Sequence, residues 1–310
     1  MPEAGPVGKG ATAALLGADP DADRTAIESV NHEPAGLPAV PAGVVSFPYF
    51  APPAQMFLCG EPVPLNEPEV REDLDREFVI EVWSRAQTTM WLKRAHRYFP
   101  EIERKLRARR LPLDLKYVAL AESDLRTLAR SSVGAIGPWQ FMAPTGEQMG
   151  LRTDQSLDER MDFERATAAA LTYLRQLKGM FGSWTTAMAA YNCGENRVKN
   201  EMKEQRVTDY YRLDLPPETE RYVFRIAAIK LIMENPRRYG FNMARDQLYP
   251  PLPCDSVPVS VRAPIHITDL AEALGTDYKM IRELNPHILG RHLPTGNYVL
   301  KVPAGSGPKL

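Results

Sequence analysis

The residue best suited to chemistry in this sequence is Glu122, which interrupts an apolar helical stripe. Leu115 and Val118 precede it at helical spacing, so the pattern directs a carboxylate toward the protein interior. A glutamate in a helix is usually exposed, and a buried one is usually paired with a cation, a role open to Arg126. Without a full counter-charge, burial raises the pKa of a carboxyl group and favours its protonated form. A general acid requires that state near neutral pH.

Two further segments place polar side chains between periodic helices. GAIGPWQFM carries Gln140, an amide that can both donate and accept, after a backbone loosened by glycines. AAYNCGENRV ends a helix with Tyr191 and Asn192, which in a protein without a site would be a core tyrosine and a helix stop. Together with Glu122, these residues favour a cleft for a polyhydroxylated ligand over a plain helical bundle.

Apolar periodicity predicts a mainly α-helical chain between residues 67 and 247. A long amphipathic helix begins near Glu67, and Pro100 is expected to end or kink it. Pro112 suits the first turn of the helix that carries Glu122, and SSVGAIGPWQFM predicts a tight loop leading into a short element. The remaining helices are expected at 163–181, at 184–191 with Gly194 closing the helix, and from Pro217 as far as Met233.

Composition divides the chain into three parts. Prolines are dense in residues 1–66, which we expect to form a largely disordered or extended arm. Residues 67–247 form the predicted helical domain. Residues 248–310 begin with a proline-rich linker and continue as a small unit with the order βααβ.

Charge and composition exclude several classes of protein. The formal net charge of −1 gives no bulk electrostatic reason to expect nucleic acid or an anionic membrane surface as a partner. No run of about eighteen apolar residues occurs, so an ordinary membrane-spanning helix is not expected. The 5 histidines have no metal-ligand spacing and no glycine-rich phosphate loop is visible, so neither a metal nor a cofactor is predicted. The 3 cysteines allow a Cys59–Cys254 clasp and leave at least one thiol free.

Five segments in order resemble a known family. They are LPLDLKYVALAESDL, ARSSVGAIGPWQFM, LDERMDFERATAAALTYLRQL, AYNCGENRV and LPPETERYVFRIAAI. This pattern resembles the lytic murein transglycosylases of the goose-lysozyme-like superfamily, most closely the membrane-bound D type. The resemblance covers roughly residues 55–245 and implies a lysozyme-like domain of packed helices.

The resemblance also implies roles for individual residues. Glu122 becomes the sole catalytic acid and base, and the residues implied to contact substrate are Ser123, Gln140, Met142, Tyr191, Asn192 and Glu218. The sequence departs from the family pattern at Asp124, Leu125, Pro138 and Cys193. The implied reaction cleaves the β-1,4 bond between N-acetylmuramic acid and N-acetylglucosamine without water and leaves a 1,6-anhydro ring.

Three competing functions are compatible with the same residues. The first is a hydrolase of the same fold, which needs a second carboxylate. Asp124 would point about 200° from Glu122 on a continuous helix, and the acids Asp158, Glu159 and Asp162 are expected to lead the helix beginning near Phe163. The second is a non-catalytic peptidoglycan-binding or scaffold protein, and the third is a helical scaffold unrelated to sugar.

The tail resembles a degenerate LysM module through LNP at 284–286 and the closing PTGNYVLKVP. In relatives this fold binds N-acetylglucosamine-containing glycans, and a small cap without a ligand is equally compatible with the pattern. The implied partner is the peptidoglycan glycan strand, and association with the membrane or with cell-wall machinery is compatible with it. We expect a periplasmic or envelope location, with an export signal that lies outside this sequence or is unconventional, because the N-terminus has no ordinary signal-peptide pattern.

Overall fold

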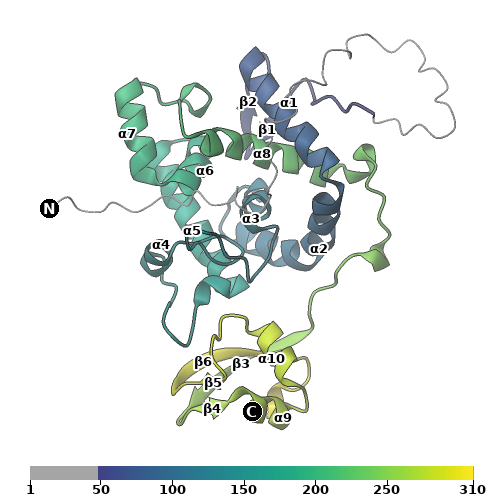
Figure 1. The fold of residues 1–310 in the computed structure, drawn as a ribbon, viewed down its shortest axis with the longest axis vertical. Helices are drawn as coiled ribbons and strands as arrows, with labels where there is room; N and C mark the ends of the chain where they lie inside the picture. Colours follow the sequence, from purple (N-terminus) through teal and green to yellow (C-terminus); the bar gives the residue numbers. More distant parts are fainter. Residues whose placement is uncertain (1–47, 310) are drawn as a thin grey trace.

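The computed structural model describes residues 48–309, so most of the predicted proline-rich arm, residues 1–47, lies outside the described residues. The described chain is mainly α-helical, as predicted (Figure 1). The helical part comprises α1 (Pro68–Trp83), α2 (Arg85–Ala108), α3 (Lys116–Ser123), α4 (Ala143–Gln148), α5 (Phe163–Phe181), α6 (Trp184–Cys193), α7 (Glu195–Gln205) and α8 (Pro217–Glu234). Among these described helices, none is both long and apolar enough to span a bilayer.

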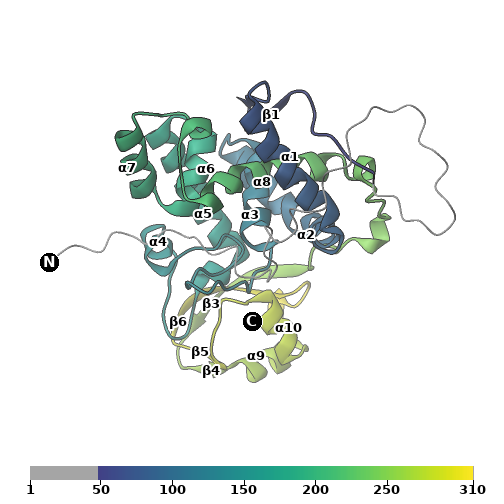
Figure 2. The same ribbon diagram turned by 45° about the horizontal axis from the view of Figure 1, so that its top comes forward.

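Helix α3 lies at the centre of the helical part, with α2, α5, α6 and α8 around it (Figures 1 and 2). Every residue from Tyr117 to Ser123 is buried, so the helix has no solvent-facing side. A helix enclosed on all faces needs apolar or small residues throughout, which KYVALAES supplies except at its two ends. The acid predicted to face inward therefore lies at the C-terminal end of a helix that is enclosed along almost its whole length.

The first long helix is broken at Ser84 and not at Pro100, contrary to the prediction. Ser84 has a non-helical ψ of 58°, and its hydroxyl donates to the Ile80 carbonyl at 2.8 Å. A serine that binds a carbonyl of its own helix in this way competes with the backbone and favours the break. Helix α2 continues through Pro100, which is exposed, so the missing hydrogen bond lies on the side where a helix bends most easily around a core.

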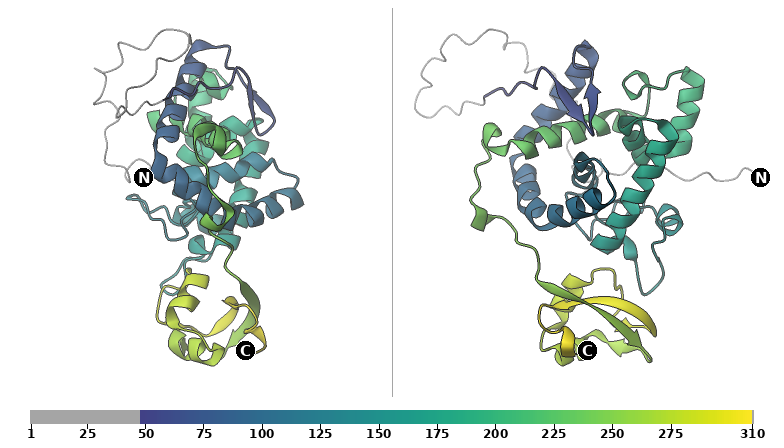
Figure 3. Two further views of the ribbon diagram at one scale, coloured as in Figure 1. Left: turned by 90° about the vertical axis from the view of Figure 1, so that its right-hand side faces the viewer. Right: turned by 180° about the vertical axis from the view of Figure 1, so that it is seen from behind.

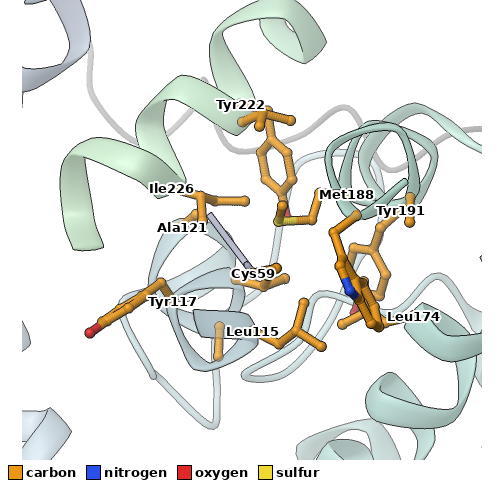
Figure 4. Close-up of a cluster of buried hydrophobic side chains, with 14 of the residues drawn as sticks. Cys59, Leu115, Tyr117, Ala121, Leu174, Met188, Tyr191, Tyr222 and Ile226 are labelled. Carbon is orange, nitrogen blue, oxygen red and sulfur yellow. The ribbon is translucent and has the colours of Figure 1, made fainter. Parts of the chain in front are cut away.

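A short hairpin extends the core of the helical part. Strands β1 (Met56–Leu58) and β2 (Glu61–Val63) pair antiparallel, and their buried side chains join the main apolar cluster. Figure 4 shows Cys59 of the hairpin turn among core residues of the helices. All 3 cysteines are free thiols, so the Cys59–Cys254 clasp is not formed. The two residues belong to different packing units, because Cys254 begins the first strand of the C-terminal part.

The C-terminal part has the order ββααββ, in which a short strand on each side of the helix pair is added to the predicted βααβ (Figure 3). Its elements are β3 (Cys254–Val261), β4 (Ile265–His266), α9 (Ile267–Leu274), α10 (Tyr278–Leu284), β5 (His292–Leu293) and β6 (Gly296–Pro303). Strands β3 and β6 pair antiparallel over eight residue pairs, from Cys254↔Pro303 to Val261↔Gly296. Its small apolar core includes Leu157, which comes from the helical part.

Candidate active site

Glu122 occupies the last turn of α3 with a side chain only 3% exposed. Its Oε1 accepts a 2.6 Å hydrogen bond from the hydroxyl of Tyr222 on α8. Glu122 also lines a pocket of about 330 Å³ together with Ala121, Ser123 and residues of α2 and α8. The carboxyl group is therefore shielded from bulk water and still borders a space that a ligand can enter.

Tyr222 is a site residue that the sequence prediction missed. Burial, followed by the Glu122 carboxylate, raises the pKa of the Tyr222 phenol well above its ordinary value, so the phenol remains a hydrogen-bond donor. In Figure 4 its ring extends from α8 toward Met188 of α6. The available signal was a tyrosine within the aliphatic stripe of Ile226 and Ile229, because a buried tyrosine hydroxyl needs an acceptor.

The helix that carries Glu122 ends directly after it. Asp124 adopts the left-handed conformation with φ 55°, and its N–H donates to the Leu120 carbonyl. Because the helix ends at Ser123, the predicted 200° separation does not apply, and Asp124 borders the same pocket as Glu122. Asp124 Oδ1 accepts hydrogen bonds from Trp91 Nε1 at 2.6 Å and from Gln87 Nε2 at 3.0 Å. Asp124 is thus anchored to α2, not placed opposite Glu122.

Buried ion pairs fix α8, which carries Tyr222, against α1. Arg221 Nε lies 2.7 Å from Glu77 Oε1, and Arg225 Nε lies 2.9 Å from Glu81 Oε1. Burial raises the pKa of the Glu81 carboxyl, and the charge of Arg225 opposes that rise. Arg225 also lines the Glu122 pocket, so the Arg225–Glu81 ion pair borders the candidate site itself.

The loop with Gln140 packs behind the end of α3. Gly137 has φ 85°, and a Cβ there would lie 1.8 Å from the Arg160 carbonyl oxygen, so glycine is required. Gln140 has φ 46°, and its Nε2 donates to the Gly137 carbonyl at 2.7 Å. Ser123 Oγ donates to the Pro138 carbonyl at 2.8 Å, which ties this loop to the helix that carries Glu122. Met142 follows the loop as a half-buried residue just before α4.

The predicted tyrosine and asparagine of α6 are both buried. Tyr191 donates from its hydroxyl to the Trp139 carbonyl at 2.8 Å. Asn192 Oδ1 accepts from Thr219 Oγ1 at 2.7 Å, and Asn192 Nδ2 is buried without a hydrogen-bond partner. Thr219 precedes Tyr222 by one helical turn, so α8 contacts Asn192 and Glu122 in succession.

The structure therefore separates the predicted residues into three groups. Glu122 and Ser123 border the pocket. Gln140, Tyr191 and Asn192 are buried in the layers joined to it, whereas Met142 and Glu218 are half-buried and do not belong to this pocket lining. Glu218 lies in the first turn of α8. Asp162 caps α5, as expected for the acids that precede that helix, by accepting from the N–H groups of Glu164 and Arg165. Across residues 48–309 no three histidine, cysteine or acidic side chains gather as metal ligands.

The residues around Glu122 are similar to those of known proteins. Residues 100–213 match the family model described as Transglycosylase SLT domain, and Glu122 lies within the matched residues. The chain is 31% identical over 223 residues to membrane-bound lytic murein transglycosylase D of Escherichia coli strain K12, covering 70% of this chain and 48% of the relative. It thus spans about half the length of that relative.

Two further similarities are more limited. Peptidoglycan transglycosylase gp16 of Escherichia phage T7 is 40% identical over 92 residues, which are 29% of this chain and 7% of that protein. Among solved structures, an inactive mutant of lytic transglycosylase Slt from Pseudomonas aeruginosa has a TM-score of 0.36 and 21% identity, covering 49% of this chain and 26% of the other.

Proposed function

We propose that this protein is a lytic transglycosylase that cleaves the β-1,4 bond between N-acetylmuramic acid and N-acetylglucosamine in peptidoglycan. The observation that carries the proposal is the position of Glu122, buried at a helix end and bordering a pocket. The match of residues 100–213 to the SLT domain and the similarity to a lytic murein transglycosylase support the same reaction.

In the proposed cycle, Glu122 first donates a proton to the glycosidic oxygen that leaves N-acetylmuramic acid. Because Tyr222 donates to Oε1, the carboxyl proton is best placed on Oε2. The ionised Glu122 then takes the proton of the C6 hydroxyl of the same sugar while that oxygen bonds to C1. One carboxyl group is restored to its starting state, and the products are a free 4-hydroxyl and a 1,6-anhydro ring.

The remaining residues are proposed to position the substrate and the acid. Asn192 Nδ2 is a buried donor without a partner, which suits an acetamido carbonyl oxygen. We assign substrate contacts to Ser123, Gln140, Met142, Tyr191 and Glu218 on the resemblance of the sequence to lytic murein transglycosylases. Gln140 Nε2 already donates to its own loop, so its side-chain oxygen is the atom offered to a ligand.

The domain boundaries and the location belong to the same proposal. We assign catalysis to residues 67–247 and a LysM-like glycan-binding role to residues 248–310. A peptidoglycan substrate implies a periplasmic or envelope protein, and the membrane-bound relative is consistent with that location.

The test is Glu122→Gln, which keeps the side-chain shape and removes the transferable proton. We expect lysis of purified murein sacculi to fall on the order of 10³-fold. Mass spectrometry of the wild-type digest should show anhydro-muropeptides, each lighter by one water than a lysozyme product. Glu147→Gln, at an exposed glutamate of α4, is the matched control. Undiminished lysis by Glu122→Gln would remove Glu122 from its role, and hydrolysed products alone would replace transglycosylation by hydrolysis.

A further inference from the structure

A second pocket, of about 370 Å³, lies where the C-terminal part meets the helical part. Residues of α2, of the loop after α3, of the start of α5 and of the C-terminal part line it. The two parts are joined directly beside it. The His287 carbonyl accepts from the Asp158 N–H at 2.8 Å, and Lys301 Nζ lies 2.8 Å from Glu164 Oε1.

Residues on one face of α2 line both this second pocket and the Glu122 pocket. Gln87, Met90 and Arg94 of α2 line the first pocket, and Arg97, Tyr98 and Glu101 line the second. These positions recur at three- and four-residue intervals, so they lie along one face of a single helix. From Ala86 to Glu101 this face extends roughly 22 Å at about 1.5 Å per residue.

The loop after α3 connects the same two pockets. Asp124 and Arg126 line the first pocket, and Thr127 and Leu128 line the second. Leu128 is 62% exposed, so its side chain is accessible to a ligand beside the second pocket. A polymer that leaves the Glu122 pocket along α2 therefore passes Leu128 before it reaches the C-terminal part.

The lining of the second pocket suits a polyhydroxylated chain with amide groups and regularly spaced carboxylates. Tyr98 and Phe163, whose ring centroids are 4.6 Å apart, supply an apolar wall for sugar ring faces. The charged groups are close to balance, because three cations face four acids. They are Arg97, Arg282, Lys301, Glu101, Asp162, Glu164 and Glu283. The acids can accept from sugar hydroxyl and amide groups, and the cations can bind the lactyl carboxylate that each peptide-free N-acetylmuramic acid carries.

His287 supplies an unused polar atom at this pocket. The residue is only 7% exposed, and its Nδ1 is buried without a hydrogen-bond partner. The nearest acid is Asp162, with Oδ2 3.5 Å from Nδ1, which is within ion-pair range but too far for a good hydrogen bond. A buried ring nitrogen left in this state can serve a ligand hydroxyl or amide.

We propose that this second pocket is a glycan subsite that holds the murein strand running from Glu122 along α2 to the C-terminal part. The inference rests on the proposed function, since it takes its ligand from that reaction. Simultaneous contact at two pockets raises the affinity for a long strand relative to a short one.

The experiment measures binding without chemistry. The full chain carrying Glu122→Gln is titrated calorimetrically with peptide-free murein glycan strands of two and of six disaccharides. We expect the longer strand to bind about tenfold more tightly, the difference that a modest second contact provides. Leu128→Arg and His287→Phe, each added to that background, are expected to reduce this ratio toward one.

A matched control separates the effect of disrupting the pocket from the effect of adding a charge to the surface. Val299→Arg places the same charge at a half-exposed β6 residue outside the pocket lining, and it should keep the tenfold ratio. Equal affinity for the two strand lengths in the parent chain overturns the inference. So does a ratio that survives both Leu128→Arg and His287→Phe. Product analysis with the wild-type enzyme tests the reaction itself, so failure of the subsite and failure of the proposed function give different results.

Discussion

Two joints between elements of this molecule are held together by different kinds of interaction. The joint between α1 and α8 buries two ion pairs, Glu77–Arg221 and Glu81–Arg225, beside an apolar cluster that includes Phe78. The joint between the helical and C-terminal parts uses a β-bridge between Leu157 and Ile288 and the ion pair of Lys301 with Glu164. Both carboxylates of the first joint are buried, at 2% and 4% side-chain exposure, whereas Glu164 in the second is 45% exposed at its side chain.

The difference follows from how accurately each joint must position its residues. Tyr222 must meet Glu122 Oε1 at 2.6 Å, and small shifts of α8 would lengthen that bond. Buried, geometrically fixed ion pairs suit this demand because they tolerate few alternative arrangements. The C-terminal joint carries no such contact with the reacting group, so a smaller and more solvated interface is sufficient there.

The largest predicted effect tests the rigid joint. Glu81→Gln leaves the Arg225 guanidinium partly buried without its carboxylate, so the free energy of unfolding should fall by about 3 kcal/mol. Urea denaturation followed by circular dichroism measures it. Glu72→Gln, at an exposed position of the same helix, is the control and should change stability by less than about 0.5 kcal/mol. Equal losses in the two variants would show that the α1–α8 joint does not depend on its buried charge.

The next effect tests the second joint. Leu157 is 2% exposed and fills the small core of the C-terminal part, so Leu157→Ala should destabilise that part by about 2.5 kcal/mol. Calorimetry should show an earlier transition for residues 254–303 while the helical part unfolds as before. Leu289→Ala, at a largely exposed leucine of the same joint, is the control. One unsplit transition that shifts as a whole would mean that the two parts unfold as one unit.

A third variant, Tyr222→Phe, links the rigid joint to catalysis. It removes one hydrogen bond to the buried Glu122 carboxyl group and keeps the ring in the core, so activity should fall about tenfold and the free energy of unfolding by about 1 kcal/mol. Removing a donor from the ionised acid should also move the alkaline limb of the pH–rate profile to higher pH. Steady-state rates on sacculi between about pH 4 and 8 measure both effects. An unchanged profile would restrict Tyr222 to packing.

The sequence predicted the helices around Glu122 better than the contacts between the helical and C-terminal parts. Periodic apolar residues determine helices such as α5 and α8 locally, and Glu122 stands out because a lone acid in an enclosed helix contradicts its surroundings. Tyr222 was missed because its acceptor lies 100 positions away in the chain, and no local pattern reports that contact. The break at Ser84 was missed because Pro100 is the stronger local signal, although exposure makes it tolerable within α2.

One contact between the two parts was missed for a related reason. Leu157 belongs to the helical part in sequence and to the C-terminal core in space. The left-handed Asp124 was equally hidden, because its conformation depends on Trp91 and Gln87, both on another helix. Contacts of this kind arise when elements pack, so a single sequence read along its length does not display them.

The smallest predicted effect distinguishes the two joints by pH. Burial lowers the pKa of His287 below its ordinary 6.5, and the positive charges of Arg165 and Lys301 act in the same direction, against the opposing charges of Asp162 and Glu159. As the pH falls below 6.5, the unfolded chain binds a proton at this histidine that the folded chain resists. Stability is therefore lost on acidification, by at most about 1.4 kcal/mol for this group between about pH 7.5 and 5.5.

The measurement is the difference in unfolding free energy between those two pH values, for the wild type and for His287→Phe. Other titrating groups are common to the two proteins and cancel in the comparison, so the variant should lose less stability on acidification. The effect should appear in the transition of the C-terminal part and not in that of the helical part, because His287 lies at the second joint. A wild-type loss equal to that of His287→Phe would mean that Asp162 holds the protonated ring as readily as water does, and the second joint would then be insensitive to pH.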